Sequence, residues 1–210
     1  MQEKVSAIIE ALKARYPDAP CALHYTKDYE LMIAVRLSAQ CTDARVNLVT
    51  PALFSAYPTL EAMANADISC VEELVHSCGF YKHKARDIVL ACQMLSTQYG
   101  GKVPGTMEEL LKLPGVGRKT ANLLLGDLYA VPGSVVCDTH CIRICGRLGL
   151  SQGKEPEKVE QQLRKILPAE ESSDFCHRIV LFGREICTAR NPKCSQCPLA
   201  LYCKEMNPSV

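Results

Sequence analysis

Apolar residues recur at helical spacing along most of the chain. Residues 5–16, 85–95 and 175–186 each carry an apolar stripe in which neighbours are three or four positions apart. Residues 31–37 are apolar on nearly every side, which predicts a central helix that is buried all round. Proline and glycine interrupt the chain between these stretches. The pattern therefore predicts an all-α fold of about ten helices joined by short loops.

In two short stretches the pattern is compatible with more than one secondary structure. Pro51 lies within a helical stretch, so either the helix bends there or Thr50 caps a new helix. Residues 133–137 could form a short strand, and an extended linker fits them equally well.

Composition excludes several classes of protein. The 210 residues are 48% hydrophobic and 22% charged, with 12 glycines and 12 prolines, which excludes disordered, collagen-like and low-complexity chains. The longest apolar run is about five residues, whereas a helix that crosses a bilayer needs roughly 18. The first residues are charged throughout and lack the apolar core of a signal peptide. We therefore expect a cytoplasmic protein with no membrane association.

Charge changes this picture only locally. The formal net charge is +1, which gives no reason to expect a polyanionic partner. Residues 178–204, however, hold five cations against one anion, Glu185. A local excess of this kind can bind phosphate whatever the average charge of the chain.

Thirteen cysteines are unusual for a protein of a reducing compartment. Their number is odd and no secretion signal precedes them, which argues against a disulfide framework. Nine lie scattered among apolar residues, and we expect these to be small buried hydrophobic side chains. They are Cys21, Cys41, Cys70, Cys78, Cys92, Cys137, Cys141, Cys145 and Cys176.

The remaining four cysteines lie close together near the end of the chain, as Cys187-x6-Cys194-x2-Cys197-x5-Cys203. Thiolates at this density in a reducing compartment are typical of a soft metal centre. Structural zinc sites usually pair two Cys-x2-Cys hooks, whereas this stretch has one hook and two outlying thiols. The spacing favours a [4Fe–4S] cluster over zinc, and a chance grouping of buried cysteines is the weakest alternative.

The loop between the first two of these cysteines carries Arg190 and Lys193. A metal centre would hold this loop rigid, so the two cations are candidate contacts for phosphate. The alternative is a solvated surface loop with no partner.

A second motif is Leu-Pro-Gly-Val-Gly-Arg-Lys-Thr at residues 113–120, between predicted helices over 107–112 and 119–129. Gly115 and Gly117 permit a tight turn, and Val116 can pack between the two helices. The N–H groups at the start of the second helix can then bind a phosphate without reading a base. The alternative is an ordinary connection between two helices.

Lys119 and Asp138 form a third candidate group. Lys119 lies in the first turn after the hairpin, and Asp138 lies where a loop meets a helix that begins near Thr139. Taken alone, these residues are more typical of a surface charge and a helix cap. They become candidates for a functional role because the hairpin would hold Lys119 beside bound DNA.

Three motifs in this order, LPGVGRKTAN, VCDTHCIR and the four-cysteine tail, resemble the endonuclease III family of helix–hairpin–helix DNA glycosylases with abasic-site lyase activity. The resemblance covers residues 3–203 and includes residues 37–47 and 79–88, which are similar to the family's DNA-probing loops. It implies two helical domains flanking a DNA-binding cleft. A six-helix domain over 22–132 would contain the hairpin at 107–129, and residues 1–21 with 133–210 would form the cluster domain.

The resemblance also implies residue roles. The amine of Lys119 would attack C1′ of the damaged nucleotide, expel the base and form a Schiff base, and β-elimination would then cut the strand on the 3′ side. Asp138 would accept a proton or stabilise positive charge on the sugar. His140 would lie close to the DNA backbone, and the cluster would be architectural.

An enzyme of this kind must extrude a base from the duplex and fill the gap. By resemblance, Gln40 fills the vacated space and Phe80 wedges the opposite strand, although a buried amide and a core aromatic are the alternatives. An aliphatic residue is common at position 80 in the family, and an aromatic ring would stack as well as wedge. Lys82 and Lys84, with His83 and Arg86, form either a phosphate-facing patch or a solvated helix face.

The expected function is removal of oxidised pyrimidines from double-stranded DNA, together with cleavage at abasic sites. The expected protein is a nucleoid-associated monomer. One alternative is an adenine-mismatch or other monofunctional glycosylase, against which Lys119 and the short tail after Cys203 argue. The other is a non-catalytic DNA-binding iron–sulfur protein, in which Lys119 would be incidental.

Overall fold

The structure is a computed structural model that describes residues 1–207. Eleven α-helices and four short 3-10 helices account for the regular structure of these residues, and no strand occurs among them. The all-α prediction is therefore confirmed. Residues 133–137 form an extended linker and do not pair as a strand.

The chain divides into two compact units. The central unit is Cys21–Tyr129, and the terminal unit is Met1–Pro20 together with the chain from Ala130 onward. The domain limits implied by the family resemblance, at residues 22 and 132, remain a prediction.

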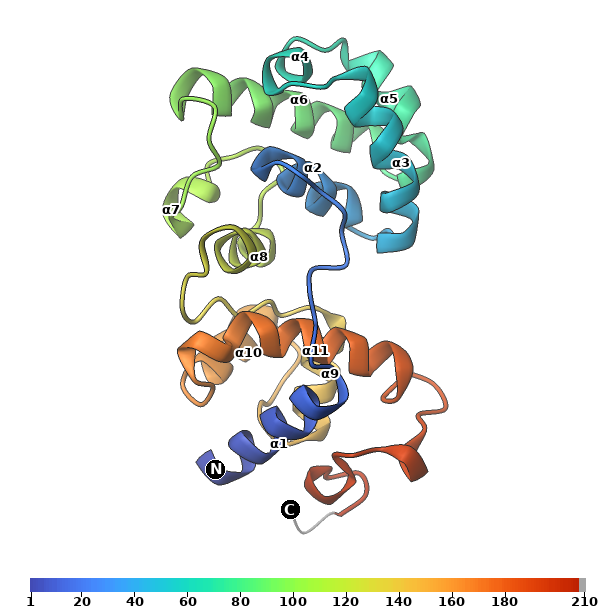
Figure 1. Ribbon diagram of the computed structural model, residues 1–210, viewed down its shortest axis with the longest axis vertical. Helices are drawn as coiled ribbons and strands as arrows, with labels where there is room; N and C mark the ends of the chain where they lie inside the picture. The colour runs from blue at the N-terminus through green and yellow to red at the C-terminus, as the bar shows by residue number, and fades with distance from the viewer. Residues whose placement is uncertain (208–210) are drawn as a thin grey trace. The chain divides into compact units, whose positions relative to one another are not determined.

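The central unit is built around α2 and α6. In α2, Leu37 and residues 29–35 are buried, as the all-round apolar pattern predicts. This helix packs against α3, α6 and α8, while α6 also contacts α4 and α5 (Figure 1). The helices of this unit are α2 (Asp28–Ser38), α3 (Asp43–Ala56), α4 (Leu60–Ala64), α5 (Ile68–Val75), η1 (His76–Cys78), α6 (Tyr81–Gln98), α7 (Met107–Leu110) and α8 (Arg118–Tyr129).

Short polar side chains begin several of these helices. The hydroxyl oxygens of Thr42, Thr59 and Thr106 accept hydrogen bonds from backbone N–H groups in the first turns of α3, α4 and α7. Each such cap stabilises its helix by about 1 kcal/mol. Pro51 lies inside α3, which runs unbroken past it, so Thr50 does not start a new helix.

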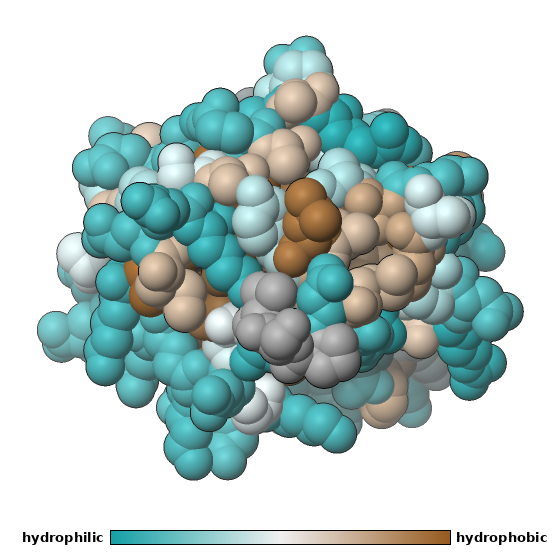
Figure 2. All heavy atoms as spheres, turned by 90° about the horizontal axis from the view of Figure 1, so that it is seen from below, coloured by the Kyte–Doolittle hydropathy of each residue, from teal (hydrophilic) through white to brown (hydrophobic). Residues whose placement is uncertain are grey.

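The terminal unit packs α11 against α1 and α9. Its core includes Leu12 of α1 and Phe175, Ile179 and Phe182 of α11. Figure 2 shows a mainly hydrophilic surface with small apolar areas. The helices of this unit are α1 (Gln2–Arg15), α9 (Thr139–Arg147), α10 (Pro156–Arg164), η2 (Ala169–Glu171), α11 (Ser172–Glu185), η3 (Cys194–Gln196) and η4 (Ala200–Tyr202).

Two expectations about polar and thiol side chains need correction. Arg178 is buried and its Nε donates to the Tyr16 carbonyl oxygen at 3.0 Å, so it adds nothing to a cationic surface. Six of the nine scattered cysteines are buried, but Cys70 is exposed and Cys21 and Cys41 are only partly buried.

No helix within residues 1–207 is long and apolar enough to cross a membrane.

Candidate functional site

The hairpin between α7 and α8 is held by its own backbone. The Leu113 N–H donates to the Leu110 carbonyl and the Val116 N–H donates to the Leu113 carbonyl, each at 3.1 Å. Val116 is buried, as expected for a residue that packs beneath the turn. The turn therefore presents the glycine backbone outward, because the apolar residue between the glycines faces the core.

The two glycines of the hairpin have different tasks. Gly115 has φ +74°, and a Cβ there would lie 2.5 Å from Arg36 Nε and 2.8 Å from Asp87 Oδ2. Arg36 and Asp87 form an ion pair at 2.7 Å, so the hairpin rests on a charged pair supplied by α2 and α6. Gly117 does not have positive φ and has nothing within 4 Å of a Cβ position, which leaves its backbone open to a ligand.

Lys119 is exposed in the first turn of α8, which begins at Arg118. N–H groups in the first turn of a helix lack partners within the helix and carry partial positive charge. The hairpin and this turn together can therefore bind a phosphate beside the Lys119 amine.

Asp138 is fixed at the N-terminus of α9 in the terminal unit. Its Oδ1 accepts a hydrogen bond from the Cys141 N–H at 2.7 Å, which confirms the predicted cap. Its Oδ2 lies 3.1 Å from His140 Nδ1. A carboxylate held by both oxygens keeps one orientation, and His140 serves here as its partner.

Gln40 and Phe80 are both exposed, which excludes the buried-amide and core-aromatic alternatives. Phe80 is 64% exposed, which is unusual for so large an apolar side chain. Gln40 has φ +55° and Phe80 has φ +49°, a left-handed conformation that costs a non-glycine residue about 1 kcal/mol or more. The loops therefore hold both side chains outward in strained conformations.

The predicted phosphate contact of Lys84 is wrong. Lys84 is 1% exposed, and its Nζ donates to the carbonyl oxygens of Leu37 and Cys78 at 2.8 Å each. The helical period of α6 turns Lys84 inward with Ala85 and Ile88. Lys82, His83 and Arg86 are exposed on the same helix and stay candidates for phosphate contact.

The four C-terminal cysteines line one small cavity. Burial raises the pKa of the Cys197 thiol, and the three neighbouring thiols raise it further. Four thiols around one cavity fit a cationic centre that would take them as thiolates.

Two arginines of α9 support the cluster loop, which we define as residues 187–203. Arg147 Nη1 donates to Cys187 Sγ at 3.2 Å and to the Thr188 carbonyl oxygen at 3.1 Å. Arg143 Nη2 donates to the Cys187 carbonyl oxygen at 2.9 Å. These two residues were missed in the sequence, although their spacing of four residues from each other places them on one face of α9.

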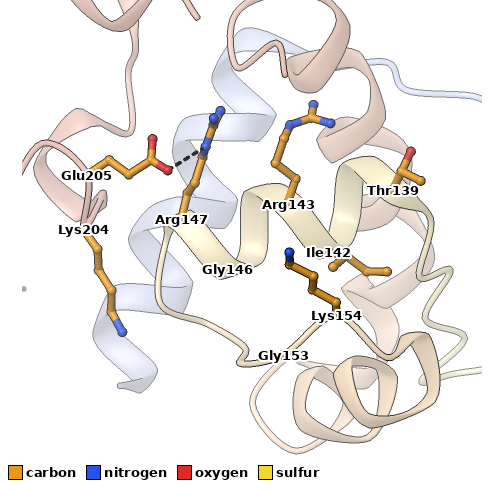
Figure 3. Close-up of a pocket in the computed structure, with 9 residues that line it drawn as sticks. All are labelled: Thr139, Ile142, Arg143, Gly146, Arg147, Gly153, Lys154, Lys204 and Glu205. Atoms are coloured by element: carbon orange, nitrogen blue, oxygen red, sulfur yellow. Dashed lines mark hydrogen bonds and ion pairs between the residues drawn. The ribbon is translucent and has the colours of Figure 1, made fainter. Parts of the chain in front are cut away.

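A cleft of about 620 Å³ runs along this face of α9. Figure 3 shows Arg143 and Arg147 above it, with Lys154 and Lys204 from the neighbouring segments. The guanidinium groups point away from the Lys204 ammonium, and Arg147 also pairs with Glu205 at 3.1 Å. The two arginines contact the cluster loop through their guanidinium groups.

Arg190 and Lys193 are exposed on the cluster loop, as a phosphate contact requires. The Lys193 N–H donates to the Ile186 carbonyl at 2.9 Å, and the Thr188 hydroxyl donates to the Arg190 carbonyl at 2.7 Å. These hydrogen bonds fix part of the loop backbone, and both cationic side chains are exposed.

Two family models match the chain. Residues 33–169 match the model described as HhH-GPD superfamily base excision DNA repair protein. Residues 187–203 match the iron–sulfur binding domain of endonuclease III. The first match contains the hairpin, and the second begins and ends at cluster-loop cysteines.

Curated relatives are similar over nearly their whole length. Endonuclease III of Synechocystis sp. is 44% identical over 202 residues, which cover 96% of this chain and 92% of the relative. Endonuclease III of Escherichia coli K12 is 38% identical over 94% of this chain and 93% of the relative.

Several solved structures are similar to this chain. A non-covalent endonuclease III–DNA complex has a TM-score of 0.92 and 41% identity, and the match covers 99% of this chain and 97% of that one. A trapped endonuclease III–DNA covalent intermediate has the same TM-score and identity, with 99% and 98% covered. A thermostable thymine-DNA glycosylase, at 19% identity and a TM-score of 0.85, shares the fold.

Proposed function

Because the chain belongs to the endonuclease III family of base-excision DNA repair enzymes, we propose that Lys119 is the nucleophile with which it removes oxidised pyrimidines and cuts abasic sites. The Lys119 nitrogen forms a bond to C1′ while the bond to the base breaks, and the amine loses a proton. The C1′–O4′ bond then opens, with a proton taken up by O4′, and leaves a Schiff base that permits loss of the C2′ proton and cleavage of the C3′–O bond. The exposed position of Lys119 in the first turn of α8 supports this role.

Asp138 is the proposed partner of this chemistry. Its carboxylate accepts the proton that Lys119 loses, or stabilises positive charge as it develops on the sugar. The hydrogen bonds from the Cys141 N–H and the contact with His140 support the role, because they fix the carboxylate before DNA binds.

Three groups of residues bind the backbone of damaged or abasic double-stranded DNA in this proposal. The hairpin at Gly115 and Gly117 binds one phosphate through backbone N–H groups, and Lys82 binds another from α6. Arg190 and Lys193 bind a third stretch of backbone from the cluster loop. The covalent and non-covalent DNA complexes of similar proteins support DNA as the partner.

Gln40 and Phe80 fill the duplex when the damaged nucleotide leaves it. Gln40 occupies the vacated space, and Phe80 enters between bases of the opposite strand. Their exposure and fixed left-handed backbone support insertion, because a preset side chain loses little freedom when it enters the stack.

The [4Fe–4S] cluster would be held by Cys187, Cys194, Cys197 and Cys203. When bound it supplies a cross-link between the two ends of the cluster loop. The chain's own part is to donate a hydrogen bond from Arg147 to Cys187 Sγ and to present the two loop cations. The proposed monomer acts at the bacterial chromosome.

The observation that carries the proposal is the exposed Lys119 at the hairpin. We expect borohydride to trap a covalent adduct with a duplex that contains one thymine glycol. Lys119→Ala should lose the adduct, whereas Lys102→Ala, which removes an exposed lysine elsewhere in the central unit, should retain it. Base release without trapping would indicate a monofunctional glycosylase. Binding with neither release nor trapping would indicate a non-catalytic protein.

A further inference from the structure

Lys84 is a fully buried cation in the central unit. Its ammonium donates to the Leu37 carbonyl oxygen and to the Cys78 carbonyl oxygen, each at 2.8 Å. Leu37 lies in the last turn of α2, where carbonyl groups have no partner within the helix. Cys78 ends η1. One side chain thus joins the ends of two elements that are far apart in sequence.

Each of these carbonyls lies just before a residue that the proposed function inserts into DNA. Gln40 follows Leu37 by three residues, and Phe80 follows Cys78 by two. Both inserted residues have positive φ and are exposed. The Lys84 ammonium therefore lies at the base of both DNA-probing loops and links them to each other.

Packing alone does not account for a lysine at this position. Burial of a charged group is costly, and a methionine would fill similar volume without that cost. Burial lowers the pKa of Lys84, the Cys41 and Cys78 thiols that face it raise the pKa, and Arg36 lowers it. Removing the ammonium would leave two buried carbonyls without their donor.

We infer that Lys84 is a positioning residue that sets the separation and orientation of Gln40 and Phe80, and that it does not touch DNA. The inference rests on the insertion roles proposed above for these two residues. A fixed pair enters the duplex together, whereas two independent loops would each have to be ordered during insertion.

The substrate distinguishes positioning from a general loss of structure. A duplex with thymine glycol requires extrusion and insertion, whereas a single-stranded oligonucleotide with an abasic site has no base to extrude and no opposite strand. We expect Lys84→Met to lower the single-turnover rate on the duplex about tenfold, as loss of two buried hydrogen bonds would. Cleavage of the single-stranded substrate should change less than about twofold.

Salt dependence distinguishes positioning from phosphate contact. The slope of log affinity against log salt is negative, and each lost phosphate contact lowers its magnitude, which we call the salt slope, by about 0.9. Lys84→Met should leave this slope unchanged, whereas Lys82→Met should lower it if that exposed lysine meets a phosphate. Lys102→Met is the control that should change neither slope nor rate.

The loop itself can be observed directly, because the chain contains no tryptophan. Phe80→Trp places a single tryptophan on the loop, and its anisotropy, excited selectively above the tyrosine absorption, reports how tightly the loop is held. Adding Lys84→Met should lower the anisotropy while the far-ultraviolet circular dichroism stays that of a folded helical protein.

Several outcomes would overturn the inference. They are an equal loss on both substrates, a lower salt slope in Lys84→Met, and unchanged rates with unchanged anisotropy. A Gln40→Ala/Phe80→Ala variant with full duplex activity would instead contradict the insertion roles, whatever Lys84 does. A Lys84→Gln variant retains an N–H donor and should recover part of the duplex rate.

Discussion

At the scale of single residues, the central unit has unusual side chains and conformations at its hairpin and at the loops that carry Gln40 and Phe80. At position 115, glycine is the only residue type that fits beside the Arg36–Asp87 pair, because any Cβ there would clash with it. Phe80 exposes an aromatic ring, and Lys84 buries a charge behind it. Each feature costs folding free energy locally, which is typical of positions that serve a ligand.

We expect Gly115→Ala to lower the free energy of unfolding by about 2 kcal/mol or more. The left-handed conformation penalises a Cβ by about 1–2 kcal/mol, and the clash with Arg36 adds to it. Gly117→Ala, where the Cβ meets nothing within 4 Å, should change the same quantity by less than about 0.5 kcal/mol. Urea unfolding of the two variants checks this, and equal losses would contradict the role of the ion pair beneath Gly115.

Cys92 makes stability depend on pH in a known direction. Burial in α6 raises the pKa of its thiol from about 9 to about 12. The stabilisation from the neutral thiol is complete below pH 9 and is lost as pH rises toward 12, because only the unfolded chain then ionises. Cys92→Ala should therefore cost about 1–2 kcal/mol at pH 7, and this deficit should shrink by about 1 kcal/mol at pH 10. Urea unfolding in reductant measures both values, and a constant deficit would contradict the shifted pKa.

At the scale of elements, α9 combines two tasks in nine residues. Its first turn is capped by Asp138, and its last turn carries Arg147, which contacts the cluster loop. Arg143 contacts the same loop one turn earlier. The helix thus connects the proposed catalytic carboxylate with the cluster loop through a single rigid segment.

The two tasks of Asp138 can be separated by substitution. Asp138→Asn keeps an oxygen that caps α9, so the free energy of unfolding should change by less than about 0.5 kcal/mol. Glycosylase and lyase rates should fall about 100-fold, because the amide accepts no proton. Asp138→Ala should lose the cap as well and cost about 1 kcal/mol. Chemical unfolding and single-turnover rates check the pair, and full activity in Asp138→Asn would refute a role for the charge.

The helical pattern predicted most elements, and local chemistry predicted some of their ends. Asp138 was identified as a cap because an aspartate at the start of a helix commonly accepts a hydrogen bond from a backbone N–H of the first turn. The direction in which Lys84 points could not be predicted, since exposed and buried lysines look alike in a charged stretch and only packing against α2 and η1 decides. The support from Arg143 and Arg147 was missed because their partners lie 40 residues or more away along the chain.

At the scale of the whole molecule, binding of DNA depends on local cations, since the net charge is only +1. In the proposed function, Arg190 and Lys193 contribute to this binding as long as the cluster loop holds them in place. The same residues on a loose loop would have to be ordered when DNA binds, and this would cost affinity.

Removing the cluster should therefore weaken DNA binding in a particular way. With a duplex that contains an uncleavable abasic analogue, we expect loss of the cluster to lower the salt slope by about 1–2, the share of two cations. The variant Arg190→Ala/Lys193→Ala should show this lower slope already when loaded, and cluster removal should lower it no further. A slope that does not change on cluster removal would contradict the role of the loop. Fluorescence anisotropy over a salt series measures all four slopes.

The double duty of α9 has a consequence for how the cell controls repair. A chain that has not received its iron keeps Lys119 and the hairpin, but Arg143 and Arg147 then hold a loop with no cross-link. We expect α9, and with it the Asp138 carboxylate, to be less well ordered in that chain. Newly made protein would therefore reach its full glycosylase and lyase activity only after it receives the cluster. In a cell short of iron, the chain would accumulate in a less active form.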